Sequence, residues 1–75
     1  MDDLENAKTK MQDWLQHNRE HQEEFERLAR RLEEAGQKET ADYIREIVRL
    51  TARSSHCLRS ALQALEDIED EGPSP

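Results

Sequence analysis

The chain has 75 residues, which fits a single domain and leaves room for only a small hydrophobic core. Only 33% of the residues are hydrophobic and 39% are charged, and there are just two Gly and two Pro, a composition that favours long helices over sheet. The net charge of -7 argues against binding to nucleic acid or to an anionic membrane, because both need an excess of Lys and Arg. The single cysteine, Cys57, cannot form an internal disulfide, and no signal peptide or long apolar run is present, so we expect a soluble cytoplasmic protein.

The first predicted helix covers residues 2–35, which contain no Gly or Pro. Asp2, followed three residues later by Glu5, fits a helix N-cap with its reciprocal partner. Apolar residues that recur alternately every three and four positions predict a seam, which is the row of side chains that faces a partner helix. The predicted seam consists of Leu4, Ala7, Met11, Trp14, Asn18, His21, Phe25, Leu28, Leu32 and Ala35.

Gly36 predicts a turn at residues 36–37, because glycine adopts the left-handed conformation that ends a helix without steric cost. A second helix is predicted over residues 38–69, with a seam formed by Ala41, Ile44, Val48, Thr51, Ser55, Leu58, Leu62 and Leu65. Residues 70–75 are acidic and rich in Pro, and are expected to form a disordered tail. Residues 1–69 are therefore predicted to fold as an all-α, antiparallel two-helix hairpin.

The second helix carries another apolar stripe, displaced by roughly 100° from its seam. One partner helix cannot cover both rows, so the stripe predicts an oligomer interface through which two hairpins form a homodimer and a four-helix bundle. The second helix would lie at the centre of this dimer and the first helix outside it. The predicted interface residues are Tyr43, Ile47, Leu50, Ser54, Cys57, Ala61, Ala64 and Ile68.

A polar layer is predicted in the middle of the hairpin. If Gly36 lies at the turn, residues whose numbers sum to about 73 lie opposite each other, because both helices rise equally per residue. Asn18 then faces Ser55, and His21 lies near Thr51. These four side chains are predicted to satisfy one another's hydrogen bonds and to fix the register of the two helices.

Three side chains of the first helix suggest a second interpretation, a metal site. His17, His21 and Glu24 step by four and three positions along one edge, and Glu20 is an alternate ligand. Two imidazoles and one carboxylate leave coordination positions open, and a symmetry-related copy would fill them to bind Zn, Ni or Fe. If no metal is bound, His21 belongs to the polar layer, the charge-rich face of this helix is simply solvated, and no cofactor is expected.

The sequence W-x2-H-N-x-E-H-x-E-E-F, from Trp14 to Phe25, is followed by Leu28 and by a segment from Gly36 to Ile44. Together these residues resemble a family of short uncharacterised prokaryotic helical-hairpin proteins. The resemblance covers most of the chain. It implies the hairpin fold and no established activity, so it assigns no catalytic residue.

Catalysis is not expected, because the sequence has no glycine-rich phosphate loop and no Ser-His-Asp arrangement with a meaningful spacing. The first functional prediction is a non-enzymatic homo-oligomer, a dimer, that acts as a scaffold or binds a protein partner. The second is a small metal-binding protein. The third, based on the charge balance alone, is an acidic mimic that inhibits a nucleic-acid-binding protein.

Cys57 is expected to be a buried residue of the dimer contact rather than a reactive thiol.

Overall fold

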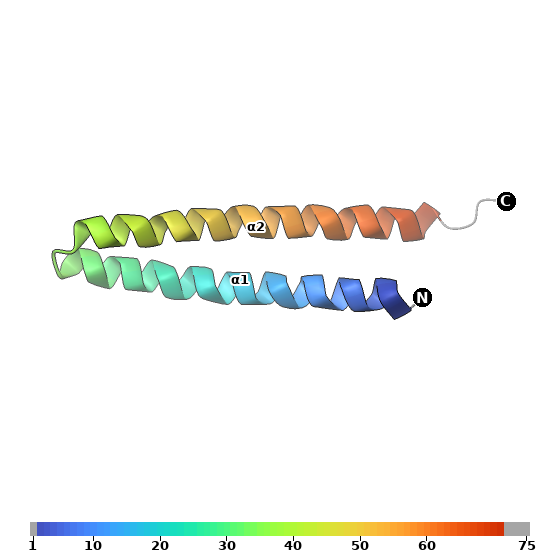
Figure 1. Cartoon of the computed structure of the whole chain (residues 1–75), viewed down its shortest axis with the longest axis horizontal. Helices are drawn as coiled ribbons and strands as arrows, with labels where there is room; N and C mark the ends of the chain where they lie inside the picture. Colours follow the sequence, from blue (N-terminus) through green and yellow to red (C-terminus); the bar gives the residue numbers. More distant parts are fainter. Residues whose placement is uncertain (1, 72–75) are drawn as a thin grey trace.

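The computed structural model describes residues 2–71, with the side chains of residues 3–67, as two long antiparallel helices. Helix α1 spans Asp2–Glu34 and helix α2 spans Lys38–Glu71. The two helices lie side by side, with the turn at one end and both termini at the other (Figure 1). The predicted all-α hairpin fold is therefore confirmed. Helix α1 ends one residue earlier than predicted and α2 continues two residues further, and residues 72–75 of the predicted tail lie outside the described residues.

The turn is a helix C-cap built around Gly36. Gly36 has a φ of 82° and donates its N–H to the carbonyl of Glu33 at 3.0 Å, while Gln37 donates to the carbonyl of Leu32 at 2.8 Å. This pair of hydrogen bonds is the Schellman motif, which satisfies carbonyls that the end of a helix leaves without partners. Helix α2 starts immediately afterwards, since Ala41 donates to the carbonyl of Gln37 at 3.0 Å.

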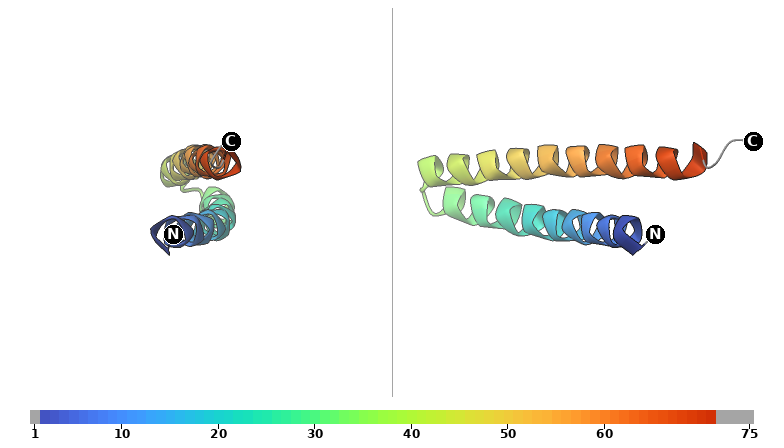
Figure 2. Two further views of the ribbon diagram at one scale, coloured as in Figure 1. Left: turned by 90° about the vertical axis from the view of Figure 1, so that its right-hand side faces the viewer. Right: turned by 45° about the vertical axis from the view of Figure 1, so that its right-hand side comes forward.

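Helix α2 turns its predicted seam toward α1. All eight predicted seam positions, from Ala41 to Leu65, are buried or half-buried, and Ala41 is 0% exposed. On α1 the most buried residue is Ala29, which is 1% exposed. Small side chains at these two positions allow the backbones to approach closely near the turn. The helices lie closest there and draw slightly apart toward the termini (Figures 1 and 2).

The predicted seam of α1 is correct in one row and, apart from Ala7, which is half-buried, wrong in the other. Met11, Asn18, Phe25 and Leu32 lie against α2 as expected. Trp14 and Leu28 instead remain 53% and 40% exposed. The inward positions belong to Leu15, Gln22 and Ala29, each one residue further along the chain. Both rows keep the alternate spacing of three and four residues. A modest rotation of α1 about its own axis therefore exchanges the row that faces α2 with the row that faces solvent. Leu4 and Ala35, at the two ends of the predicted seam, are also exposed.

The hairpin is a thin rod, with Cα extents of 64 × 16 × 12 Å. Within the described residues, no large side chain is fully buried. Viewed end-on, the helices cross at a small angle, as packed long helices do (Figure 2). No helix in the described part of the chain is apolar over a stretch long enough to cross a membrane.

Candidate functional site

The hairpin has two different broad faces, because the rows of side chains beside the two seams differ in character. On α1, every seventh residue from residue 12 lies along one side of the seam, and every seventh residue from residue 14 lies along the other side. On α2, the corresponding rows start at residues 45 and 47. The rows that start at residues 12 and 45 form what we call the polar face, which consists of Gln12, Arg19, Glu26, Glu33, Arg45, Ala52, Arg59 and Glu66.

An ion pair across the polar face fixes which rows share a side. Arg45 of α2 donates to both carboxylate oxygens of Glu33 on α1, from Nη2 at 2.9 Å and from Nη1 at 3.3 Å. Nη1 also lies 3.7 Å from Oδ1 of Asp42. The hydrogen bond and charge of Arg45 hold the pKa of Glu33 below its ordinary value; burial opposes this shift slightly, and Lys38 adds to it. Because Glu33 and Arg45 lie on the same side, the remaining two rows lie together on the opposite side.

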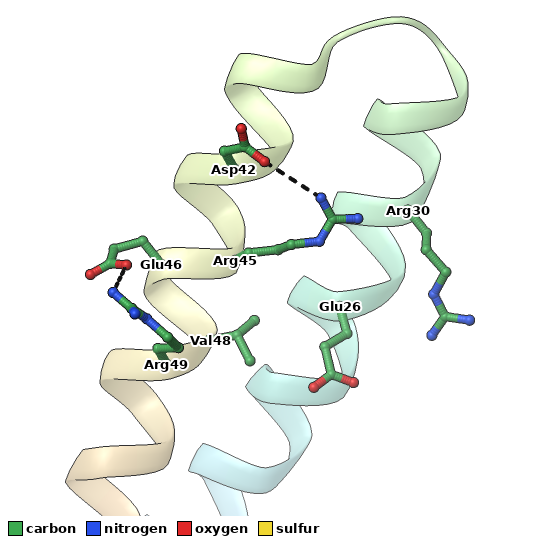
Figure 3. A pocket seen from close by; sticks show the side chains of 7 residues that line it. All are labelled: Glu26, Arg30, Asp42, Arg45, Glu46, Val48 and Arg49. Atoms are coloured by element: carbon green, nitrogen blue, oxygen red, sulfur yellow. Dashed lines mark hydrogen bonds and ion pairs between the residues drawn. The ribbon is translucent and has the colours of Figure 1, made fainter.

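The polar face contains an open hollow of about 660 Å³ beside this pair (Figure 3). Its wall includes Glu26 and Arg30 from α1, and Asp42, Arg45, Glu46, Val48 and Arg49 from α2. Arg49 pairs with Glu46 on the same helix. The hollow has three arginines and three carboxylates, so its charges compensate one another and leave no excess of either sign to hold an ion.

The opposite side of the hairpin is apolar and uncovered, and both helices contribute to it. Trp14 and Leu28 of α1 are 53% and 40% exposed, and Tyr43, Ile47 and Leu50 of α2 are 67%, 39% and 60% exposed. We call this surface the apolar face, which consists of Trp14, His21, Leu28, Tyr43, Ile47, Leu50, Ser54, Cys57, Ala61 and Ala64, all of them exposed. It includes seven of the eight predicted interface residues; the side chain of the eighth, Ile68, lies outside the described residues.

The structure brings together part of the predicted polar layer. Asn18 donates from Nδ2 to Oγ of Ser55 at 3.2 Å and to Oγ of Ser54 at 3.3 Å, and Ser55 is only 5% exposed. Thr51 does not join them, because its Oγ1 donates to the carbonyl of Ile47 on its own helix at 2.9 Å. His21 is also outside the layer. Its side chain is 59% exposed on the apolar face, because Gln22 occupies the inward position.

The predicted metal ligands are all exposed side chains of α1. His21 Nδ1 lies 4.0 Å from Oε1 of Glu24, and the His21 ring stacks on Phe25 with centroids 5.9 Å apart. His17 and Glu20 are exposed. Among the residues whose side chains are described, no three His, Cys, Asp or Glu side chains are grouped closely enough to hold a metal ion.

Cys57 is exposed on the apolar face of the single hairpin. It was expected to be buried at a dimer contact, and a single chain leaves this position open to solvent. The thiol lies on the α2 stripe between Ser54 and Ala61, so its neighbours along the stripe are small side chains.

The fold and this surface define a small helical hairpin with one uncovered apolar face and little core of its own. The chain belongs to the family described as "Domain of unknown function (DUF8180)", which matches residues 7–65. This match agrees with the predicted resemblance to an uncharacterised family, and it includes the segment from Trp14 to Phe25. Neither the curated proteins nor the solved structures compared with the chain give a match.

Proposed function

We propose that this protein is a non-enzymatic helical module that works as a homodimer, in which two hairpins pair through their apolar faces and form a four-helix bundle. The bundle would serve as a scaffold or as a unit that binds other proteins. The observation that carries this proposal is the apolar face itself: five large hydrophobic side chains are 39% to 67% exposed on one side of a hairpin. Exposed apolar surfaces of this kind mark contacts between proteins.

The size of the exposed surface supports pairing. A compact monomer of 8.8 kDa exposes about 4,800 Å² by the usual scaling of surface with mass. This chain exposes 6074 Å². The elongated hairpin therefore leaves more surface exposed than a compact chain of the same mass, and this surface is available for contact with a second copy.

The composition of the hairpin core also supports pairing. The only buried hydrophobic residues in the described part of the chain are two alanines, Ala29 and Ala41. Burial of apolar surface is the main favourable term in folding, at about 25 cal/mol per Å². A second hairpin on the apolar face would convert a two-helix contact into a bundle with a continuous interior.

The first test is Leu50→Glu, because this substitution places a charge in the centre of the proposed contact. A charge that enters an apolar interface without a partner costs several kcal/mol, and each 1.4 kcal/mol is a factor of ten in affinity, so the dissociation constant should rise by at least about 100-fold. The variant should be monomeric and less helical at low concentration. Sedimentation equilibrium and far-ultraviolet circular dichroism measure the two effects.

Ala52→Glu is the matched control, because Ala52 is exposed on the polar face of α2, only two residues along the chain from Leu50. It introduces the same charge at nearly the same height and should leave the dimer intact. A wild-type protein with the mass of one chain at micromolar concentration would disprove the homodimer. Equal weakening by both substitutions would show that charge alone, and not the apolar face, governs association.

A further inference from the structure

We infer that the second copy lies on the apolar face with its turn at the opposite end of the bundle, so that α2 of one copy packs antiparallel on α2 of the other. This inference rests on the proposed homodimer and specifies its arrangement. A face-to-face pair can have both turns at one end or at opposite ends. In either case every neighbouring pair of helices is antiparallel, so helix direction does not decide between the two arrangements.

The first deciding observation is a gradient of side-chain size along α2. Near the turn, the apolar face carries Tyr43, Ile47 and Leu50, which are 67%, 39% and 60% exposed. Between Ser54 and residue 67, where the described side chains end, the same stripe has small side chains, which are Cys57, Ala61 and Ala64. The stripe therefore changes from large to small near the middle of the hairpin.

When the two turns are at opposite ends, the large side chains of one α2 face the small side chains of the other α2. In this arrangement the two α2 helices are antiparallel, with their Ser54 residues at the same height. Residues whose numbers sum to about 108 then face each other, because both helices rise equally per residue. Ile47 then faces Ala61, and Leu50 faces Cys57. With both turns at one end, α2 instead stacks on α1 of the other copy, so Tyr43, Ile47 and Leu50 of one copy lie at the height of Leu28 of the other. The large side chains of both copies would then crowd together near the turns. Well-packed interfaces avoid both crowding and voids.

The second deciding observation is the uneven distribution of charge. The half of the hairpin nearer the turn, residues 18–54, has eight Lys and Arg against nine Asp and Glu. The half nearer the termini, residues 2–17 and 55–71, has three against nine. With both turns at one end, the two strongly acidic halves would lie about 10 Å apart, close to the Debye length at physiological salt. Opposed turns place each acidic half beside a nearly neutral half.

The central polar contact fits the same arrangement. Asn18 of α1 reaches Ser54 of α2 at 3.3 Å, so both residues lie at the middle of the hairpin. The two α1 helices are then also antiparallel and centred near this height. Trp14 of one copy lies over His21 of the other, and Leu28 lies over Ala7. The Asn18–Ser54 contacts of the two copies then lie next to the two-fold axis of the dimer, where they fix the register of all four helices.

The test is a distance between the two turns of the dimer. A nitroxide label is attached at residue 37 of a Gln37→Cys, Cys57→Ser variant, and the distance between the two labels is measured by pulsed electron spin resonance. A helix of 33 residues is about 50 Å long, so opposed turns should give about 50 Å. Turns at one end should give less than about 25 Å, because the labels would then be separated only by the width of the bundle.

A label at the middle of the hairpin separates failure of this inference from failure of the homodimer. In an Ala52→Cys, Cys57→Ser variant, either arrangement should give about 30 Å, the thickness of two helix layers with their labels. A long distance at residue 37 with a short one at residue 52 supports opposed turns. Short distances at both positions, or a mixture at residue 37, overturn this inference alone. An absence of dipolar coupling at both positions overturns the homodimer as well.

Discussion

Individual residues determine where the first helix ends. Gly36 has a left-handed φ of 82°, and a Cβ built on it would meet no atom within 4 Å. The need for glycine at this position is therefore conformational and does not come from crowding. Any other residue would adopt this left-handed conformation only at an energetic cost, because its own Cβ disfavours it.

We predict that Gly36→Ala lowers the free energy of unfolding by about 1 to 2 kcal/mol, which is the cost of the left-handed conformation for an L-residue. Gly36→Asn should cost less, because asparagine tolerates this conformation better than alanine. Urea unfolding followed by circular dichroism, at one fixed protein concentration, measures both values. Equal stability of the alanine variant and the wild type would contradict the proposed role of the turn.

The ion pair between Glu33 and Arg45 gives a second prediction at the scale of single residues. The pKa of the Glu33 carboxyl lies below its ordinary value, because Arg45 donates a hydrogen bond to it and attracts its charge. Carbon-detected NMR titration should therefore give Glu33 a pKa below that of an unpaired glutamate. Arg45→Leu should move it back toward the ordinary value.

The sign of the corresponding pH effect follows from linkage. Because the pKa of Glu33 is lower in the folded than in the unfolded chain, its stabilising contribution is present above the unfolded pKa. It is lost as the pH falls through the folded pKa. The difference in stability between wild type and Glu33→Gln should therefore shrink in acid. A difference that stays constant down to pH 2 would show that the charge of Glu33 does not contribute.

At the scale of the helices, the sequence predicts α2 better than α1. Every predicted seam residue of α2 packs inward, because only one of its two apolar stripes lies opposite α1 in the hairpin. In α1, the row containing Trp14 and the row containing Leu15 both complete the same spacing with Met11 and Asn18. Their spacing does not distinguish the two rows. The choice depends on the other helix, which approaches closely at Ala29 and pairs Arg45 with Glu33.

The same ambiguity explains which part of the candidate site could be predicted. The α2 half of the apolar face follows from the second stripe in the sequence. The α1 half was missed because Trp14, His21 and Leu28 had been placed in the seam. The contact between Asn18 and Ser55 was predicted correctly, since the arithmetic of an antiparallel hairpin depends only on the position of the turn. Opposite charges at residues 33 and 45, on flanking rows near the turn, were a usable signal for the polar face.

At the scale of the whole molecule, pairing must overcome charge. Each chain has a net charge of -7, so two copies repel each other in any arrangement. The apolar faces provide attraction that does not depend on charge, and opposed turns reduce the repulsion without removing it. The ion pairs described above lie within one hairpin and would not hold two copies together.

We therefore predict that salt strengthens the dimer. Between about 0.01 M and about 1 M salt, the Debye length falls from about 30 Å to about 3 Å, which screens the repulsion between the two chains. The dissociation constant measured by sedimentation should fall over this range. The double variant Asp13→Asn, Glu66→Gln removes two exposed charges from the acidic half and should show a weaker dependence on salt. A dissociation constant that instead rises with salt would mean that ion pairs between the copies, and not the apolar faces, hold the dimer together.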